Sequence, residues 1–200
     1  MITIIFVTHA TSVDNERHRA SGQCDVPLSE KGEQQAREVG RRHERKALDT
    51  IFCSDLQRSH RTAHLAFANR PLPIVQDPRL REYDYGDFTQ RPMAEVKAEE
   101  VNRLVEPFPH GESCQMAAQR IRSFLQDLLE QYEGKKVLII GHRATQHGLE
   151  HWILGKPLEE SISAPFTWQP GWTYFLEGLW PVVRGIESLS GYGCLRDSSS

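Results

Sequence analysis

The chain opens on a short apolar segment, Ile2 to Val7, which ends close to a histidine, His9. The segment is rich in β-branched residues and does not alternate with polar ones, which is typical of a strand buried on both faces. A polar, turn-forming stretch follows at residues 10–28. Open α/β sheets bind ligands at the carboxyl ends of their strands. The pattern therefore predicts that His9 lies at a ligand-binding edge.

The remaining segments alternate between strand and helix patterns. Ser29 is the expected N-cap of the first helix, and Ser54 or Asp55 that of the second. The alternation predicts a three-layer α/β/α sandwich with a largely parallel central sheet. Further strands are expected at 50–54, 72–76, 137–141 and 172–176, and helices at 30–46, 56–67, 93–105, 113–132 and 142–154.

Length and composition fit one globular domain of 200 residues. We assign it to residues 1–180, followed by a C-terminal tail at 181–200 whose end, from residue 189, is expected to be mobile. A net charge of −3 gives no field that would favour nucleic acid or an anionic membrane. The four cysteines lack metal-ligand spacing, and the opening apolar segment is too short for a membrane span. A cytoplasmic protein is expected.

Groups that can bind or attack phosphate follow three of the predicted strands. His9 and His142 each end a strand, and Arg58 lies in the helix after the strand at 50–54. Neutral imidazole is a nucleophile, and guanidinium offers forked donors that match phosphate oxygens. Glu82 and Asp84 follow the third strand and can supply an acid/base. Each residue alone is usually an ordinary core or surface group, so their convergence supports the prediction.

Residues 77–112 are irregular and rich in Pro and Gly, as in a lid or pocket wall. The side chains expected to line this wall are Tyr83, Tyr85, Phe88, Met93, Phe108 and His110. Their mixture of aromatic and polar groups does not identify a substrate.

Several motifs between residues 1 and 155 resemble those of the histidine phosphatase superfamily, which includes the cofactor-dependent phosphoglycerate mutases. The matching motifs are Thr8-His9-Ala10, Asn15, Ser21-Gly22, Asp25-Val-Pro-Leu-Ser-Glu-Lys-Gly32, Ser54-Asp-Leu-Gln-Arg58-Ser-His-Arg-Thr-Ala63, Leu80-Arg-Glu82-Tyr-Asp-Tyr-Gly86, Gly111-Glu-Ser113 and His142. They occur in the family's order. The motifs around Asp25 and Arg58 are the most specific.

The resemblance implies a phosphoglycerate mutase-like fold and a role for each matching residue. His9 would attack phosphorus and form a phosphohistidine, and Glu82 would protonate the leaving oxygen and then activate water. The phosphate would be bound by Arg58, His142 and Asn15, with Ser21 and Gly22 also in the substrate-binding set. No metal or other cofactor is implied, because arginine and histidine neutralise the charge.

Two positions depart from the family pattern. Thr8 replaces the arginine of Arg-His-Gly, and Arg143 replaces the glycine that usually follows the second histidine. Loss of one charge-assisted phosphate contact costs about 3 kcal/mol, or roughly a hundredfold in rate. We hypothesise that Arg143 returns the missing guanidinium from the opposite side of the pocket, so both Thr8 and Arg143 are included in the predicted substrate-binding set.

The sequence predicts a metal-independent phosphatase for small phosphomonoesters, with no nucleic-acid or membrane partner. A pseudophosphatase that only binds phospho-ligands is one alternative, suggested by Thr8. A phosphoglycerate mutase-like phosphotransferase is another, although the short segment between Glu82 and His142 favours hydrolysis. The pattern His147-Gly-Leu-Glu-His151 also matches a zinc-protease motif, but it lacks an evident third ligand. The physiological substrate and the oligomeric state stay open.

Overall fold

The computed structural model describes residues 1–179, so the predicted tail at 181–200 lies outside the described residues. No helix in this described range is long and apolar enough to cross a lipid bilayer. The strands are β1 (Ile2–Thr8), β2 (Thr50–Cys53), β3 (Ile74–Gln76), β4 (Lys136–Gly141) and β5 (Trp172–Leu176). The helices are α1 (Val13–Glu16), α2 (Glu30–His43), α3 (Gln57–Phe67), α4 (Met93–Glu100), α5 (Cys114–Gln131), α6 (Arg143–Leu154) and α7 (Leu158–Ser163).

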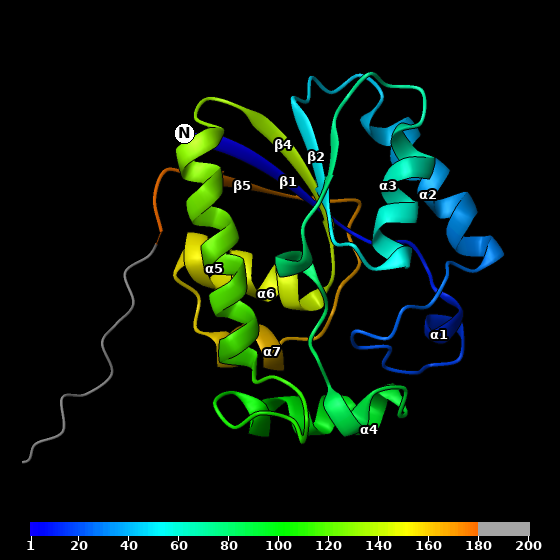
Figure 1. Cartoon of the computed structure of the whole chain (residues 1–200), viewed down its shortest axis with the longest axis vertical. Coiled ribbons are helices and arrows are strands. Elements are labelled where there is room, and N and C mark those ends of the chain that lie inside the picture. Colours follow the sequence, from blue (N-terminus) through cyan, green and yellow to red (C-terminus); the bar gives the residue numbers. More distant parts are fainter. Residues whose placement is uncertain (180–200) are drawn as a thin grey trace, which may run out of the picture.

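The five strands form one sheet in the order β3-β2-β4-β1-β5. β1, β2, β3 and β4 are parallel, and β5 is antiparallel to β1 at the edge. Helices α2 and α3 cover one face of the sheet, and α5 and α6 cover the other (Figure 1). The predicted three-layer α/β/α architecture with a largely parallel sheet is therefore confirmed.

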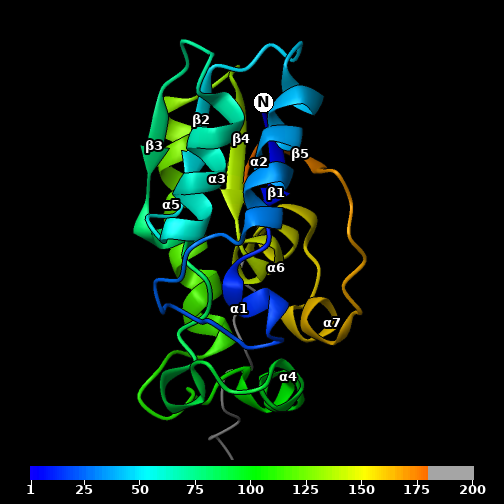
Figure 2. The same ribbon diagram turned by 90° about the vertical axis from the view of Figure 1, so that its right-hand side faces the viewer.

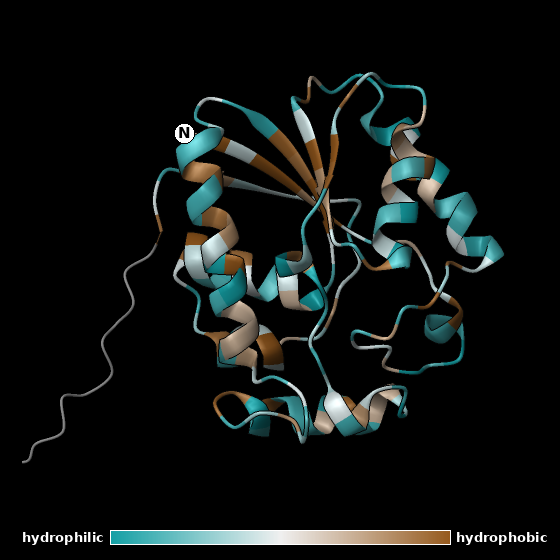
Figure 3. Ribbon diagram, in the orientation of Figure 1, coloured by the Kyte–Doolittle hydropathy of each residue, from teal (hydrophilic) through white to brown (hydrophobic). Residues whose placement is uncertain are grey.

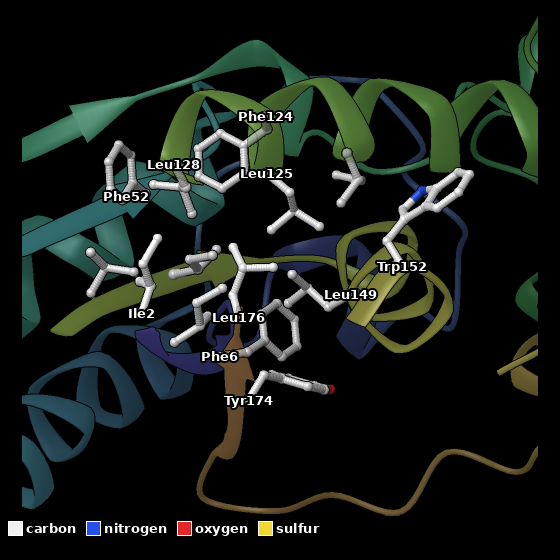
Figure 4. Packing of buried hydrophobic residues seen from close by; sticks show 14 of the residues in the cluster. Ile2, Phe6, Phe52, Phe124, Leu125, Leu128, Leu149, Trp152, Tyr174 and Leu176 are labelled. Atoms are coloured by element: carbon white, nitrogen blue, oxygen red, sulfur yellow. The ribbon is translucent and has the colours of Figure 1, made fainter. Parts of the chain in front are cut away.

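Apolar side chains fill the space on both sides of the sheet. Ile121, Phe124, Leu125 and Leu128 recur at helical spacing along α5 and pack against the sheet and α6, as Figure 4 shows for the last three. Trp152 of α6 donates its indole N–H to the Ala118 carbonyl at 2.7 Å, so its polar atom is satisfied in the core. Brown strands flanked by helices with teal outer faces show this pattern along the chain (Figure 3).

Residues 77–112, which we call the lid segment, contain α4 and three short 3₁₀ turns and extend beyond the carboxyl end of the sheet (Figure 2). The expectation that its aromatic residues line a pocket is wrong for Tyr83, Tyr85 and Phe108, which are 1–3% exposed. These rings pack against one another in a third cluster with Val96. His110 faces outward and contacts Asp87.

Three local predictions differ from the structure. The polar stretch at 10–28 contains the short helix α1, and α7 follows α6 where no helix is expected. The prediction that Ser54 or Asp55 caps α3 is wrong, because Leu56 is the N-cap residue and makes no side-chain cap. The amide of Gln57 instead donates to the distant Asp25 carboxylate at 2.6 Å. Ser54 and Asp55 are both engaged by partners far away in the sequence.

Candidate active site

Strand pairing brings His9 and His142 together. β1 and β4 are adjacent and parallel, with Thr8 opposite Gly141, so the residues that follow lie side by side. The His9 amide donates to the Gly141 carbonyl at 3.0 Å, and the two imidazole centroids are 4.9 Å apart. The two predicted histidines therefore share one edge of the sheet.

The hydrogen bond of the His9 ring fixes which nitrogen is free. Nδ1 lies 2.7 Å from the Ala10 carbonyl, and a carbonyl oxygen can only accept, so Nδ1 carries the proton. Burial, and then the positive charge of Arg58, lower the pKa of His9 to about 3. The ring is thus neutral near pH 7, with its lone pair on Nε2. This is the form of imidazole that attacks electrophiles.

His142 is held by the neighbouring strand. Its Nε2 lies 2.6 Å from the hydroxyl of Ser54, directly after β2, and its Nδ1 has no hydrogen-bond partner within residues 1–179. Burial, followed by the charge of Arg58, lowers the pKa of His142 well below its ordinary value. A buried ring nitrogen without a partner is costly in the free protein and is available to a ligand.

Arg58 is a buried cation beside these rings, with only 1% of the residue exposed. Its two terminal nitrogens donate to the carbonyls of Cys24 and Gly22 at 3.0 and 2.7 Å. Gly22 adopts a left-handed backbone with φ of +53°, which a side chain would strain. In the described part of the chain no carboxylate forms an ion pair with Arg58. Burial of an unpaired charge is unfavourable, so the site favours an anionic ligand.

The Glu82 carboxylate lies against the N-terminus of α6. It accepts hydrogen bonds from the amides of Tyr83, Arg143 and Ala144 at 3.0, 3.3 and 2.9 Å. Backbone N–H groups and the helix dipole both stabilise a carboxylate at this position. Because α6 starts directly after His142, the carboxylate approaches the paired imidazoles from the lid segment.

Asn15 and Ser21, two other predicted substrate-binding residues, form hydrogen bonds outside the site, whereas the Thr8 side chain forms none within the described residues. Asn15 is exposed and its Oδ1 accepts from the Ser12 amide at 3.0 Å, which caps α1. Ser21 donates to the Asp14 carboxylate at 3.1 Å. The Thr8 side chain ends β1, partly buried, and makes no hydrogen bond to any residue in the range 1–179. Roles for Asn15, Ser21 and Thr8 in substrate binding stay predictions.

The Arg143 guanidinium contacts two residues outside the predicted phosphate-binding set. It donates to the Gln146 side chain at 2.7 Å and lies 4.9 Å from the centroid of the Phe166 ring. Arg143 would have to leave both partners to replace the missing arginine. Compensation for Thr8 therefore requires a change in the conformation of the Arg143 side chain.

The two histidines of the zinc-protease pattern have separate partners. His147 Nδ1 lies 2.8 Å from the Tyr83 hydroxyl, and His151 Nδ1 lies 2.9 Å from the Lys156 carbonyl. Within residues 1–179, no group of three His, Cys, Asp or Glu residues is arranged to hold a metal ion.

Sequence reasoning missed Ser54 as the partner of His142 and the carbonyls of Gly22 and Cys24 as the support of Arg58. The position of Ser54 could have been inferred from its place at the end of the predicted strand at 50–54, because this strand pairs with β4, which His142 follows. The two carbonyl contacts carry no side-chain signature and cannot be inferred from residue types.

Comparisons with known proteins agree with this geometry. The model of the histidine phosphatase superfamily (branch 1) matches residues 4–168. A protein of Erwinia tasmaniensis named "Probable phosphoglycerate mutase GpmB" is 36% identical over 165 residues, covering 78% of this chain and 77% of its own. Bacillus stearothermophilus YhfR superposes with a TM-score of 0.77 at 27% identity, covering 94% of this chain and 98% of its own. A mycobacterial glucosyl-3-phosphoglycerate phosphatase, in complex with VO3, gives a TM-score of 0.72 at 25% identity, covering 82% and 87% of the two chains.

Proposed function

The chain belongs to the histidine phosphatase superfamily, branch 1, and from that membership we propose that it is a metal-independent phosphatase acting through a phosphohistidine on His9. Its similar proteins are named as phosphatases and as a mutase, which supports phosphoryl chemistry. The substrates in this proposal are small phosphomonoesters. The protonated Nδ1 of His9, held by the Ala10 carbonyl, is the observation on which the proposal chiefly rests.

In the first step, Nε2 of His9 attacks phosphorus and the ester P–O bond breaks. Arg58 and His142 stabilise the charge on the transferring phosphoryl oxygens, because one is a buried unpaired cation and the other offers an unpartnered ring nitrogen. The dianionic phosphate bound beside Glu82 opposes the charge of its carboxylate, so Glu82 takes up a proton when substrate binds. It gives this proton to the leaving oxygen, and an alcohol departs. The product is phosphohistidine with a Glu82 carboxylate.

In the second step, water attacks the phosphohistidine. The Glu82 carboxylate accepts a proton from that water, the P–N bond breaks, and His9 recovers its Nε2 lone pair. Inorganic phosphate leaves, and Glu82 is again protonated for the next cycle. The proposal includes Arg143, whose guanidinium would leave Gln146 and Phe166 to supply the charge that is absent at Thr8.

A mutase is the second candidate, because the relative from Erwinia tasmaniensis is named as one. A mutase would return the phosphoryl group from His9 to a second position on an organic acceptor instead of to water. Phosphoglycerate distinguishes the two activities directly: a phosphatase releases inorganic phosphate, whereas a mutase converts 3-phosphoglycerate into 2-phosphoglycerate.

The test is a screen of phosphomonoesters on the wild type, on His9→Ala, and on His64→Ala as a matched control from the exposed side of α3. We expect His9→Ala to lose activity at least about 10³-fold and His64→Ala to keep it. When the wild type is turning over a ³²P-labelled substrate and the reaction is quenched with alkali, an alkali-stable, acid-labile phosphoprotein should be trapped. His9→Ala should lack this species. Activity that persists in His9→Ala would refute the proposal, and phosphate binding without turnover would support a binding module.

A further inference from the structure

The backbone carbonyl of Glu82 is held from two directions. Gln23 donates its side-chain amide to this oxygen at 3.2 Å, and Arg120 of α5 donates a terminal nitrogen to it at 2.9 Å. The two donors come from elements that are about a hundred residues apart in the sequence. A carbonyl with two side-chain donors has little freedom to tilt, so the peptide that precedes Tyr83 is fixed in orientation.

Arg120 makes further contacts along the same stretch of backbone. Its other terminal nitrogen donates to the Arg79 carbonyl at 2.6 Å, and its fork also contacts the Glu112 carboxylate at 2.8 and 3.2 Å. Glu112 in turn accepts from the Asp84 amide at 3.0 Å. Arg120 and its partner Glu112 therefore link the backbone on both sides of Glu82 to α5 by hydrogen bonds. Their side chains are only 18% and 12% exposed, which protects the pair from solvent.

Gln23 links these hydrogen bonds around Glu82 to the loop that supports Arg58. The side-chain oxygen of Gln23 accepts a hydrogen bond from Arg81 at 3.3 Å. Its chain neighbours Gly22 and Cys24 accept hydrogen bonds from Arg58 through their backbone carbonyls. The proposed proton donor and the buried cation thus share one short loop as a support.

Both ends of Glu82 are attached to packed helices as a result. The backbone is attached to α5 through Arg120, and the carboxylate is attached to the N-terminus of α6 through the amides of Arg143 and Ala144. Helices α5 and α6 lie side by side against the same face of the sheet (Figure 1). A proton donor must lie within hydrogen-bond reach of the leaving oxygen, and a displacement of about 1 Å costs roughly a hundredfold in rate.

We propose that Arg120 is a positioning residue for the proton donor Glu82: it holds the backbone of Glu82 at the depth from which the carboxyl group reaches the leaving oxygen. The inference rests on the proposed function and adds a residue outside the motif residues given a role in the reaction. Arg120 touches no substrate in this proposal. Its removal should therefore impair proton donation while leaving attack by His9 intact.

The leaving group separates these two steps. An alkyl phosphate needs a proton on its departing oxygen, whereas p-nitrophenolate is a stable anion that departs without one. kcat/KM reports the steps up to phosphoryl transfer to His9. We expect Arg120→Met to lower kcat/KM about a hundredfold for the best alkyl phosphate and less than about threefold for p-nitrophenyl phosphate, matching Glu82→Gln. Equal losses for both substrates would overturn the proposal.

Three further variants sharpen the test. Arg122→Met removes a guanidinium from the same helix that lies over Trp152, and it should not distinguish the substrates. Arg120→Lys keeps the charge but cannot span two carbonyls and a carboxylate, so it should behave like Arg120→Met. Recovery by lysine would mean that charge, and not position, matters. Gln23→Leu removes the other donor to the Glu82 carbonyl and should give the same selective loss at about tenfold, which keeps the test valid if Arg120→Met does not fold.

Amide hydrogen exchange provides a measurement that does not depend on activity. The Arg143 and Ala144 amides, which donate to the Glu82 carboxylate, should exchange at least about tenfold faster in Arg120→Met than in the wild type, because the carboxylate no longer stays in place. Unchanged exchange would overturn the positioning role. A wild type that hydrolyses neither substrate through His9 would instead refute the proposed function. The exchange rates of the two amides would still test whether Arg120 positions Glu82.

Discussion

The edge of the sheet and the lid segment both supply groups to the site, but they hold those groups in different ways. At the sheet edge, backbone pairing of β1 with β4 sets His9 beside His142. In the lid segment, the position of Glu82 depends on side-chain donors from α5 and the loop at 22–24, and on amides of α6. Proton donation therefore depends on side chains far from the reacting groups, whereas the placement of the histidine pair depends mainly on the backbone of the sheet.

The interiors of the two regions differ as well. The clusters on the two faces of the sheet are built almost entirely of apolar side chains. The cluster under the lid segment contains buried polar pairs, with the Tyr83 hydroxyl on His147 and the Tyr85 hydroxyl on Glu100, both at 2.8 Å. Buried ionisable groups tie stability to pH. The raised pKa of Glu100 in the lid segment makes stability fall as pH rises, whereas the lowered pKa values of His9 and His142 at the sheet edge make it fall as pH drops.

The largest effect is expected at the sheet edge, from Arg58→Met. The buried guanidinium would no longer bind the transferring phosphoryl group, so kcat/KM should fall about 10³-fold for alkyl and p-nitrophenyl phosphates alike. This uniform loss contrasts with the selective loss expected for the residues that position Glu82. Arg61→Met, on the same helix but exposed and paired with Glu33, is the control. A loss that depends on the leaving group would remove the distinction between the two regions.

A glycine pair tests how tightly the lid segment is packed. Gly86 has φ of +50°, and a Cβ there would lie 2.0 Å from the Pro109 carbonyl oxygen. Gly134 has φ of +74° with nothing within 4 Å of such a Cβ. Gly86→Ala should lower the free energy of unfolding by about 3 kcal/mol, and Gly134→Ala by about 1 kcal/mol from backbone strain alone. Urea titration of both variants measures this, and equal losses would show a lid segment that adapts freely.

Arg143 joins the two regions, since its amide contacts Glu82 and its chain neighbour is His142. Because its guanidinium is held by Gln146 and Phe166, we expect only about a tenfold fall in kcat/KM for Arg143→Ala, in place of the hundredfold typical of a resident phosphate ligand. Phe166→Ala should free the guanidinium and leave activity unchanged or raised. An Arg143→Ala variant as active as the wild type would refute compensation for Thr8.

The smallest effect concerns stability. Burial, as the largest influence, raises the pKa of Glu100, so the folded protein holds this proton more tightly than the unfolded chain does. The associated stability is fully present below the ordinary pKa of 4.5 and is lost as pH rises through the raised value. Glu100→Gln cannot ionise and still accepts from Tyr85. It should be more stable than the wild type by about 1 kcal/mol at pH 7 and equal to it at pH 4, by thermal melting; an equal difference at both pH values would contradict this.

Strong local patterns made most of the fold predictable. The uninterrupted apolar residues of β1 and β4 and the helical spacing on α5 gave these elements to within one or two residues. The short helices α1 and α7 lack such patterns, because four and six residues are too few to show a helical repeat of apolar side chains. The N-cap of α3 could not be inferred because Asp25, which supplies the capping carboxylate, is 32 residues away from Gln57.

The site was predictable only where it depends on strand ends. Parallel strands place His9 and His142 at one edge, and this follows from sequence patterns alone. Two backbone carbonyls accept hydrogen bonds from Arg58, and Arg120 donates to the Glu82 carbonyl. These tertiary contacts cannot be inferred from residue types. The conformation of the Arg143 side chain could not be predicted either, because its guanidinium lies over Phe166, in a segment without a clear sequence pattern.

β1 lies inside the sheet, next to the edge strand β5, and this position has a consequence for synthesis of the protein. Its two neighbours are β4 and β5, at residues 136–141 and 172–176, so β1 leaves the ribosome well before the strands with which it pairs. During translation this apolar segment therefore stays without a partner, and such segments attract chaperones and other unfolded chains. Nascent chains that stop short of β4 cannot bring the two imidazoles together, so the histidine pair forms only after β4 has been made.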